Sequence, residues 1–158
     1  MKRLVYLIIH CTATPAGREV TADDIRCWHL SPPPAGRGWR QVGYSRLFTL
    51  DGNSVVLVGD NGDNWVQANE ITNGATGMNG ESQHIVYAGG TDIQGHPEDT
   101  RTEKQRVAMA EFVRDFVHKH PDVLIAGHNQ FAAKACPSFD VAEWLREIEI
   151  PEKNIYKK

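Results

Sequence analysis

Three side chains that bind transition metals follow the ends of short apolar segments. His10 closes the apolar run over residues 5–10, and His128 comes two residues after the run over 123–126. Cys136 lies eight residues beyond His128. Zinc accepts imidazole and thiolate ligands tetrahedrally, and its catalytic sites keep three protein ligands and one solvent position. If the two apolar runs are neighbouring strands of one sheet, these three side chains can converge on a zinc ion.

Such a site has the chemistry of a hydrolase. With one thiolate ligand it keeps a net positive charge, so the zinc polarises a carbonyl group and lowers the pKa of its water toward neutrality. Lys134 precedes Cys136 by two residues, and in an extended stretch its ammonium points to the same face and can stabilise an oxyanion. Tyr44 enters another expected strand, where its phenol can hydrogen-bond the attacking water or the oxyanion.

Each of these residues also has a simpler interpretation. A histidine at a strand end is more often a hydrogen-bonded structural residue. A single buried cysteine usually packs as a small apolar side chain. Lys134 alone would be a solvated surface residue, and Tyr44 alone a packing residue. Spacing by itself therefore leaves the zinc site and the structural interpretation both open.

The elements that must position these residues alternate between strands and helices. Strands are expected over residues 5–10, 45–50, 54–58, 83–88 and 123–126, and helices from residue 21, from 102 to about 118, and from 140. Thr21 with Asp24 and Thr102 with Gln105 have the spacing of capping boxes. Asp51-Gly52-Asn53 predicts a hairpin between two of the strands. This pattern predicts a single α/β domain, a central mixed β-sheet flanked by helices, over residues 1–150. Residues 151–158 are expected to fray.

Composition limits the possible partners and compartments. The formal net charge of -3 in 158 residues provides no general attraction to nucleic acid or to anionic membranes. Three cysteines, an odd number with no C-x-x-C pair, argue against a disulfide framework or a redox centre. The six apolar residues after Arg3 are fewer than a signal peptide needs, and no segment approaches the roughly 20 that cross a bilayer. We expect no signal peptide or transmembrane segment, and synthesis in the cytoplasm.

Four stretches together resemble the type 2 N-acetylmuramoyl-L-alanine amidases, the family of phage lysozyme-type amidases and peptidoglycan recognition proteins. They are Ile9-His10-Cys11-Thr12-Ala13-Thr14; Ile25-Arg26-Cys27-Trp28-His29 with Gly38-Trp39 and Val42-Gly43-Tyr44; Gly127-His128; and Lys134-Ala135-Cys136-Pro137-Ser138-Phe139-Asp140. They span about residues 4 to 146 in family order. The resemblance implies the family's fold, a zinc ion (Zn²⁺) held by His10, His128 and Cys136, and catalytic roles for Tyr44 and Lys134.

The sequence also departs from the family pattern. Ser45 follows Tyr44 where many relatives carry histidine, and Gly74 stands where the phage-type enzymes have histidine. The triple proline at 32–34 looks like an insertion. We interpret Trp28 and His29 as packing residues, and we expect the loop over 59–80 and residues near Pro32 to line a substrate groove.

The resemblance implies hydrolysis of the amide bond between N-acetylmuramic acid and L-alanine in peptidoglycan. We expect a monomer with peptidoglycan or a muropeptide as its partner, acting on the cell wall after release or export. Two alternatives stay open: a recognition module that binds peptidoglycan without turnover, and a cytoplasmic amidase that recycles soluble muropeptides.

Overall fold

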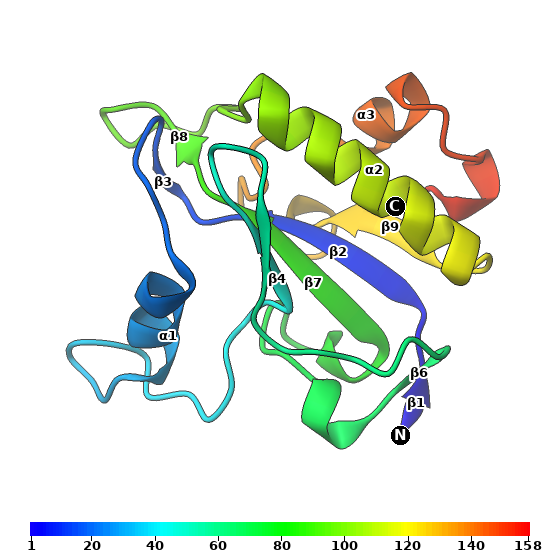
Figure 1. Cartoon of the computed structure of the whole chain (residues 1–158), viewed down its shortest axis with the longest axis horizontal. Coiled ribbons are helices and arrows are strands. Elements are labelled where there is room, and N and C mark those ends of the chain that lie inside the picture. Colours follow the sequence, from blue (N-terminus) through cyan, green and yellow to red (C-terminus); the bar gives the residue numbers. More distant parts are fainter.

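A five-stranded mixed sheet forms the centre of the computed structural model, which describes residues 1–158 (Figure 1). The strand order is β5-β4-β7-β2-β9, with bounds Ser54–Val56, Arg46–Phe48, Ser82–Tyr87, Tyr6–Cys11 and Leu124–Gly127. β4, β7, β2 and β9 are parallel, whereas β5 runs antiparallel to β4 across the hairpin turn at Gly52. The mixed sheet and the hairpin expected from the sequence are confirmed.

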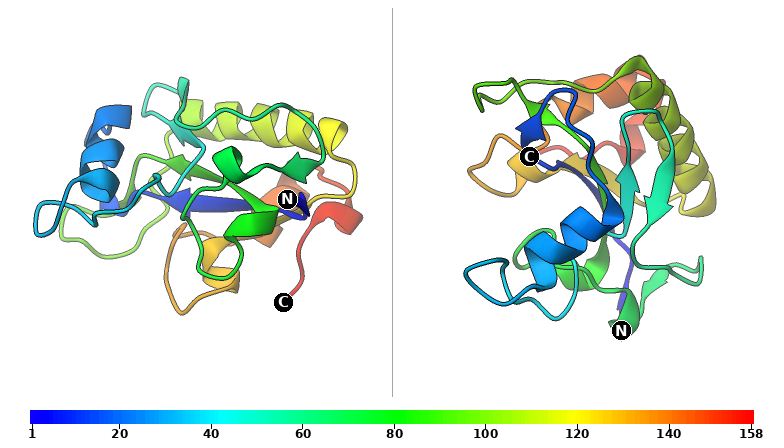
Figure 2. Two further views of the ribbon diagram at one scale, coloured as in Figure 1. Left: turned by 90° about the horizontal axis from the view of Figure 1, so that it is seen from below. Right: turned by 60° about the vertical axis from the view of Figure 1, so that its left-hand side comes forward.

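The two faces of the sheet are covered unequally. On one face Leu7, Ile9 and Ile85 pack against α2 (Glu103–Lys119) and α3 (Val141–Glu147) in a core of 19 buried residues. On the opposite face a smaller cluster of six buried residues joins Val86 to Ile25 of α1 (Ala22–Leu30). Figure 1 shows α2 lying along the sheet, and Figure 2 shows α1 standing at one end of it. The face without α2 therefore has room for a site.

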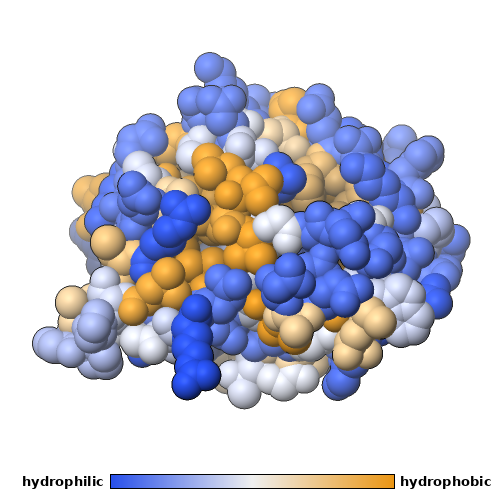
Figure 3. Space-filling view, turned by 60° about the horizontal axis from the view of Figure 1, so that its bottom comes forward, coloured by the Kyte–Doolittle hydropathy of each residue, from blue (hydrophilic) through white to orange (hydrophobic).

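That less covered face has a mixed surface. Figure 3, in which the bottom of Figure 1 comes forward, shows apolar residues gathered near the middle of the view with hydrophilic residues around them. None of the helices combines the length and apolar character that a bilayer crossing requires.

The three helices begin where the capping residues predict. The Thr21 side chain accepts a hydrogen bond from the Asp24 N–H, and Thr102 does the same for Gln105, each as part of a complete capping box. Asp140 caps α3 by accepting from the Glu143 N–H. These side chains satisfy N–H groups that have no partner within the first turn of a helix.

Short elements that the sequence did not reveal complete the fold. β1 (Lys2–Arg3) pairs with β6 (Trp65–Val66), and β3 (Thr14–Pro15) pairs with β8 (Gly90–Thr91). The segment 59–80, expected to be a loop, contains β6, the 3-10 turn η1 (Ala68–Glu70) and the start of η2 (Asn79–Glu81). Strands of two residues are too short to show a period in the sequence.

The expectation that residues 151–158 fray is wrong for residues 154–156. Its 3-10 turn η4 (Glu152–Asn154) places Asn154 and Ile155 in the interior, where they are 0% and 2% exposed. The Asn154 side-chain amide donates to the carbonyls of Pro121 and Val123 at 2.8 and 2.9 Å. The Tyr156 N–H donates to the Ile125 carbonyl at the free edge of β9. The tail is ordered because it satisfies carbonyl groups of β9 and of the residues just before it.

Candidate metal centre

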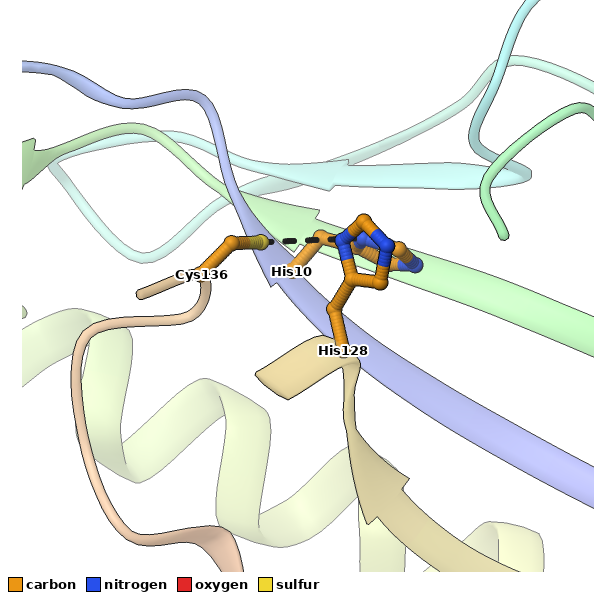
Figure 4. A group of neighbouring side chains, drawn as sticks. All are labelled: His10, His128 and Cys136. Atoms are coloured by element: carbon orange, nitrogen blue, oxygen red, sulfur yellow. Dashed lines mark hydrogen bonds between the residues drawn. The ribbon is translucent and has the colours of Figure 1, made fainter. Parts of the chain in front are cut away.

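The topology brings the three candidate ligands to one end of the sheet. β2 lies between β7 and β9 and is parallel to both, with Ile9 opposite Gly127. His10 and His128 each follow this pair, and Cys136 reaches them from the turn before α3. The ligand atoms of the three residues all lie within 4.8 Å of one another (Figure 4). The adjacency of the two strands, on which the sequence argument depended, is present.

The donor set and its spacing fit a tetrahedral zinc ion. Cys136 Sγ lies 3.7 Å from His10 Nδ1. Zinc–nitrogen and zinc–sulfur bonds of about 2.0 and 2.3 Å at the tetrahedral angle separate the two ligand atoms by roughly 3.5 Å. Two imidazoles and a thiolate are borderline to soft ligands, which suit zinc better than calcium or magnesium. The three residues therefore fit a zinc ion without rearrangement of the sheet.

Both histidines are held in the neutral form that a metal needs. His10 is 1% exposed, and burial holds its pKa well below the usual value, helped by the nearby His84, His128 and Lys134. Burial followed by the charge of Lys134 also lowers the pKa of His128. Because protons compete with metal ions for the imidazole nitrogens, the lowered pKa values favour metal binding at neutral pH.

The thiol of Cys136 lies beside a second thiol. The backbone N–H of Cys11 donates to Cys136 Sγ at 3.3 Å, and the two side chains also hydrogen-bond to each other. The pKa for losing the first proton of this pair is lowered, because the remaining thiol donates to the thiolate. The pKa of the second ionisation is raised by the hydrogen bond between the two side chains, by burial and by the negative charge already present. A single ionisation of the Cys11–Cys136 pair is thus favoured over a double one.

A pocket of about 300 Å³ opens beside His128. One side of the pocket comes from the end of α1 and the chain after it, and another from residues 43–44, here called the Tyr44 segment. Residues 73–76 and the turn after η3 (His128–Gln130) complete it. The lining includes His29, Arg37, Trp39, Asn73, Thr76 and Phe131. The expected contribution of the loop over 59–80 is present in part, through residues 73–76. On the side expected from residues near Pro32, Arg37 and Trp39 line the pocket, whereas Pro32 itself does not.

Tyr44 and Lys134 both border this pocket. The Tyr44 ring centroid lies 5.1 Å from that of His10, and burial together with the neighbouring thiols raises the pKa of the phenol, which stays protonated. Lys134 is exposed and does not lie in the expected extended stretch, because residues 132–134 form a tight turn in which the Lys134 N–H donates to the Ala132 carbonyl. It reaches the pocket from that turn, close enough for its charge to act on His10 and His128.

Ser45, which departs from the family pattern, and His29, which was interpreted as a packing residue, both have structural roles. Ser45 donates its hydroxyl to the His84 carbonyl at 2.7 Å, so it fastens the Tyr44 segment to β7. His29 is buried against Trp39 and Tyr44, and its Nδ1 accepts the Gly43 N–H at 2.9 Å. His29 packs as expected, and it also forms part of the pocket wall.

Sequence reasoning missed His84 and Asn79. His84 Nδ1 lies 2.9 Å from His10 Nε2, and its Nε2 lies 3.0 Å from Asn79 Oδ1. Burial lowers the pKa of His84 to about 3, so its ring is neutral. The available signal was a histidine in the interior of a strand that is otherwise apolar, since such a group needs buried hydrogen-bond partners.

This fold and site define an α/β protein with a two-histidine, one-cysteine candidate metal centre that opens into a pocket. The family described as N-acetylmuramoyl-L-alanine amidase matches residues 1–139. An endolysin of Enterobacteria phage K11 is 32% identical over 142 residues, covering 90% of this chain and 85% of the relative. An endolysin of Klebsiella phage KP32 is 30% identical over 144 residues, covering 91% and 87%. The chain belongs to the N-acetylmuramoyl-L-alanine amidase family and is a cell-wall amidase.

Solved structures share the fold. An endolysin from Thermus scotoductus bacteriophage Ph2119 aligns with a TM-score of 0.71 at 21% identity, covering 93% of this chain and 86% of that one. Bumblebee PGRP-SA aligns with a TM-score of 0.69 at 20% identity, covering 99% and 86%. The single α/β domain expected from the sequence is thus confirmed as the fold of amidases and peptidoglycan recognition proteins.

Proposed function

We propose that this chain is a zinc-dependent amidase that cleaves the bond between N-acetylmuramic acid and L-alanine in peptidoglycan, as a lysin of the cell wall. The observation that carries this proposal is the convergence of His10, His128 and Cys136 within 4.8 Å beside an open pocket. A bound zinc ion would supply Lewis acidity, which polarises the scissile carbonyl and lowers the pKa of a water molecule.

The other site residues would act on the substrate. Hydrolysis adds water to the lactyl carbonyl of muramic acid, and negative charge then develops on the carbonyl oxygen. The protonated Tyr44 phenol can donate a hydrogen bond to this oxygen. The Lys134 ammonium stabilises the same charge and can assist proton transfer to the leaving amine of alanine. Both groups border the pocket that would hold the scissile bond.

The site also bears on the two alternatives. A recognition module without turnover needs no complete ligand set, whereas here all three ligands converge. One of them, His128, lines a pocket together with Tyr44 and Lys134, the two catalytic candidates. Lysis of intact wall is favoured over recycling because the relatives at 30% identity or more are endolysins. Every residue of the proposed site comes from one chain, so we propose that the protein acts as a monomer.

Cysteine variants test the zinc site. Cys136→Ala removes the thiolate ligand, and we expect loss of bound zinc, measured by metal analysis, and loss of amidase activity. Activity is measured on purified sacculi by mass spectrometry of the new L-alanine amino termini. Cys27→Ala is the matched control, since Cys27 is exposed on α1. Release of stem peptides by Cys136→Ala at the parental rate would show that the mechanism is wrong.

A comparison of two substrates in the same assay tests whether the protein acts on intact cell wall or on soluble fragments. We expect faster turnover of intact sacculi than of soluble muropeptides. The reverse preference would support the recycling alternative, and zinc binding without turnover of either substrate would support the recognition module.

A further inference from the structure

His84 is a buried histidine that neither lines the pocket nor belongs to the three candidate ligands. It lies in β7, is 0% exposed, and pairs in register with Ile8 of β2. Residues two apart on a strand share a face, so the side chains of His84 and His10 project from the same face of the sheet. Their ring centroids are 5.0 Å apart, and His84 Nδ1 lies 2.9 Å from His10 Nε2. One of these two nitrogens must therefore donate to the other.

The hydrogen-bond chain decides which one donates. Asn79 Oδ1 accepts the backbone N–H of Ala75 at 2.9 Å, which identifies this atom as the oxygen of the amide. The same oxygen lies 3.0 Å from His84 Nε2, so Nε2 carries a hydrogen and donates. A neutral imidazole has one N–H and one lone pair, so His84 Nδ1 is an acceptor. His10 Nε2 must then carry the hydrogen that His84 receives.

The position of this hydrogen determines which nitrogen of His10 can bind a metal ion. With its hydrogen on Nε2, the His10 ring has its lone pair on Nδ1, the atom that lies 3.7 Å from Cys136 Sγ. We propose that His84 is a positioning residue for the amidase: held by Asn79, it fixes the ring and the tautomer of His10 so that Nδ1 presents a lone pair to the metal. This inference rests on the proposed zinc site. Partners of this kind typically change metal affinity by 10–100-fold.

Gly74 makes space for the His84 ring. A Cβ atom at this position would lie 2.4 Å from His84 Nδ1 and 2.8 Å from the Gly43 carbonyl oxygen. Any side chain at position 74 would therefore displace the ring or the Tyr44 segment. Glycine at 74 and histidine at 84 form a matched pair: the absence of a side chain at one position is what allows the imidazole of the other to reach His10.

The test compares two substitutions at His84 with a buried histidine elsewhere. His84→Phe keeps an aromatic ring but accepts no hydrogen bond. His84→Gln can accept from His10 with its carbonyl oxygen and donate to Asn79 with its amide. His120→Phe is the matched control, because His120 is also buried but bonds to Asn64, away from the ligands. Circular dichroism and unfolding curves confirm which variants fold.

Two measurements decide the proposal. Nitrogen-15 NMR of the metal-free parent should show His10 with its hydrogen on Nε2. Chelator competition should show zinc affinity reduced 10–100-fold in His84→Phe, restored to within a few-fold in His84→Gln, and unchanged in His120→Phe. A parent His10 with its hydrogen on Nδ1, or equal zinc affinity in the parent and His84→Phe, overturns the proposal.

The same data separate this inference from the proposed function. Failure of the parent to bind zinc refutes the zinc amidase and removes the role of His84 with it, even where the NMR tautomer is as expected. Normal zinc binding by both the parent and His84→Phe refutes only the role of His84. If His84→Phe does not fold, Asn79→Ala provides the second variant: it removes the oxygen that accepts from His84 Nε2, so it should also lower zinc affinity. Parental zinc affinity in a folded Asn79→Ala would overturn the proposal.

Discussion

The docked C-terminal segment yields a prediction of definite size. Ile155 is 2% exposed and belongs to the core of 19 buried residues, where it forms a bridge with Ile125 of β9. Ile155→Ala removes buried carbon atoms and leaves a cavity. Substitutions of this kind cost about 2–5 kcal/mol of unfolding free energy. A frayed tail would instead lose no more than about 0.5 kcal/mol, as exposed positions do.

The expected loss is large enough to measure without ambiguity. A cost of about 3 kcal/mol corresponds to a fall in Tm of roughly 6–12 °C for a domain of this size. The measurement is urea unfolding of the parent and the variant, with Tm by calorimetry as a second readout. Ile93→Ala is the matched control, because Ile93 is 85% exposed and loses the same atoms without leaving a cavity.

The result also bears on the metal centre. The Gln130 side chain donates to the Tyr156 carbonyl at 3.3 Å, and the rings of Phe131 and Tyr156 lie 4.7 Å apart. These contacts hold the turn that carries His128 against the tail. If Ile155→Ala and Ile93→Ala lose the same small amount of stability, the tail is not part of the core and the domain ends near residue 150.

Two further predictions concern catalysis and pH. Lys134→Ala and Tyr44→Phe should each lower kcat by about 10²–10³-fold, because each removes a group that stabilises the oxyanion. Zinc content should stay at the parental level, since neither residue is a ligand. Parental kcat in both variants would exclude these roles. The second concerns His29, whose pKa is lowered to about 4 by burial and by the charge of Arg37. Between about pH 6.5 and 4 the unfolded chain therefore binds more protons than the folded one. The unfolding free energy falls as pH falls through this window, by at most about 1.4 kcal/mol per pH unit. Urea unfolding of the zinc-free protein at several pH values should show a smaller slope for His29→Gln, and an unchanged slope would contradict the assignment.

The sequence by itself determined the elements and the chemistry. The apolar runs that became β2, β7 and β9, and the capping boxes at Thr21 and Thr102, depend on neighbours within a few residues, so local patterns were sufficient. The types of the candidate ligands His10, His128 and Cys136 were readable for the same reason. Their motif order, together with Tyr44 and Lys134, also indicated the amidase family.

Only the tertiary structure decided how these pieces meet. The placement of β2 between β7 and β9 brings ligands separated by more than 100 residues within 4.8 Å, and no local pattern encodes that pairing. The same is true of His84, which reaches His10 from a neighbouring strand through space that Gly74 leaves empty. The polar tail looked free in the sequence because its hydrogen-bond partners, the carbonyls of residues 121, 123 and 125, are brought to it only in the folded protein, in β9 and the chain just before it.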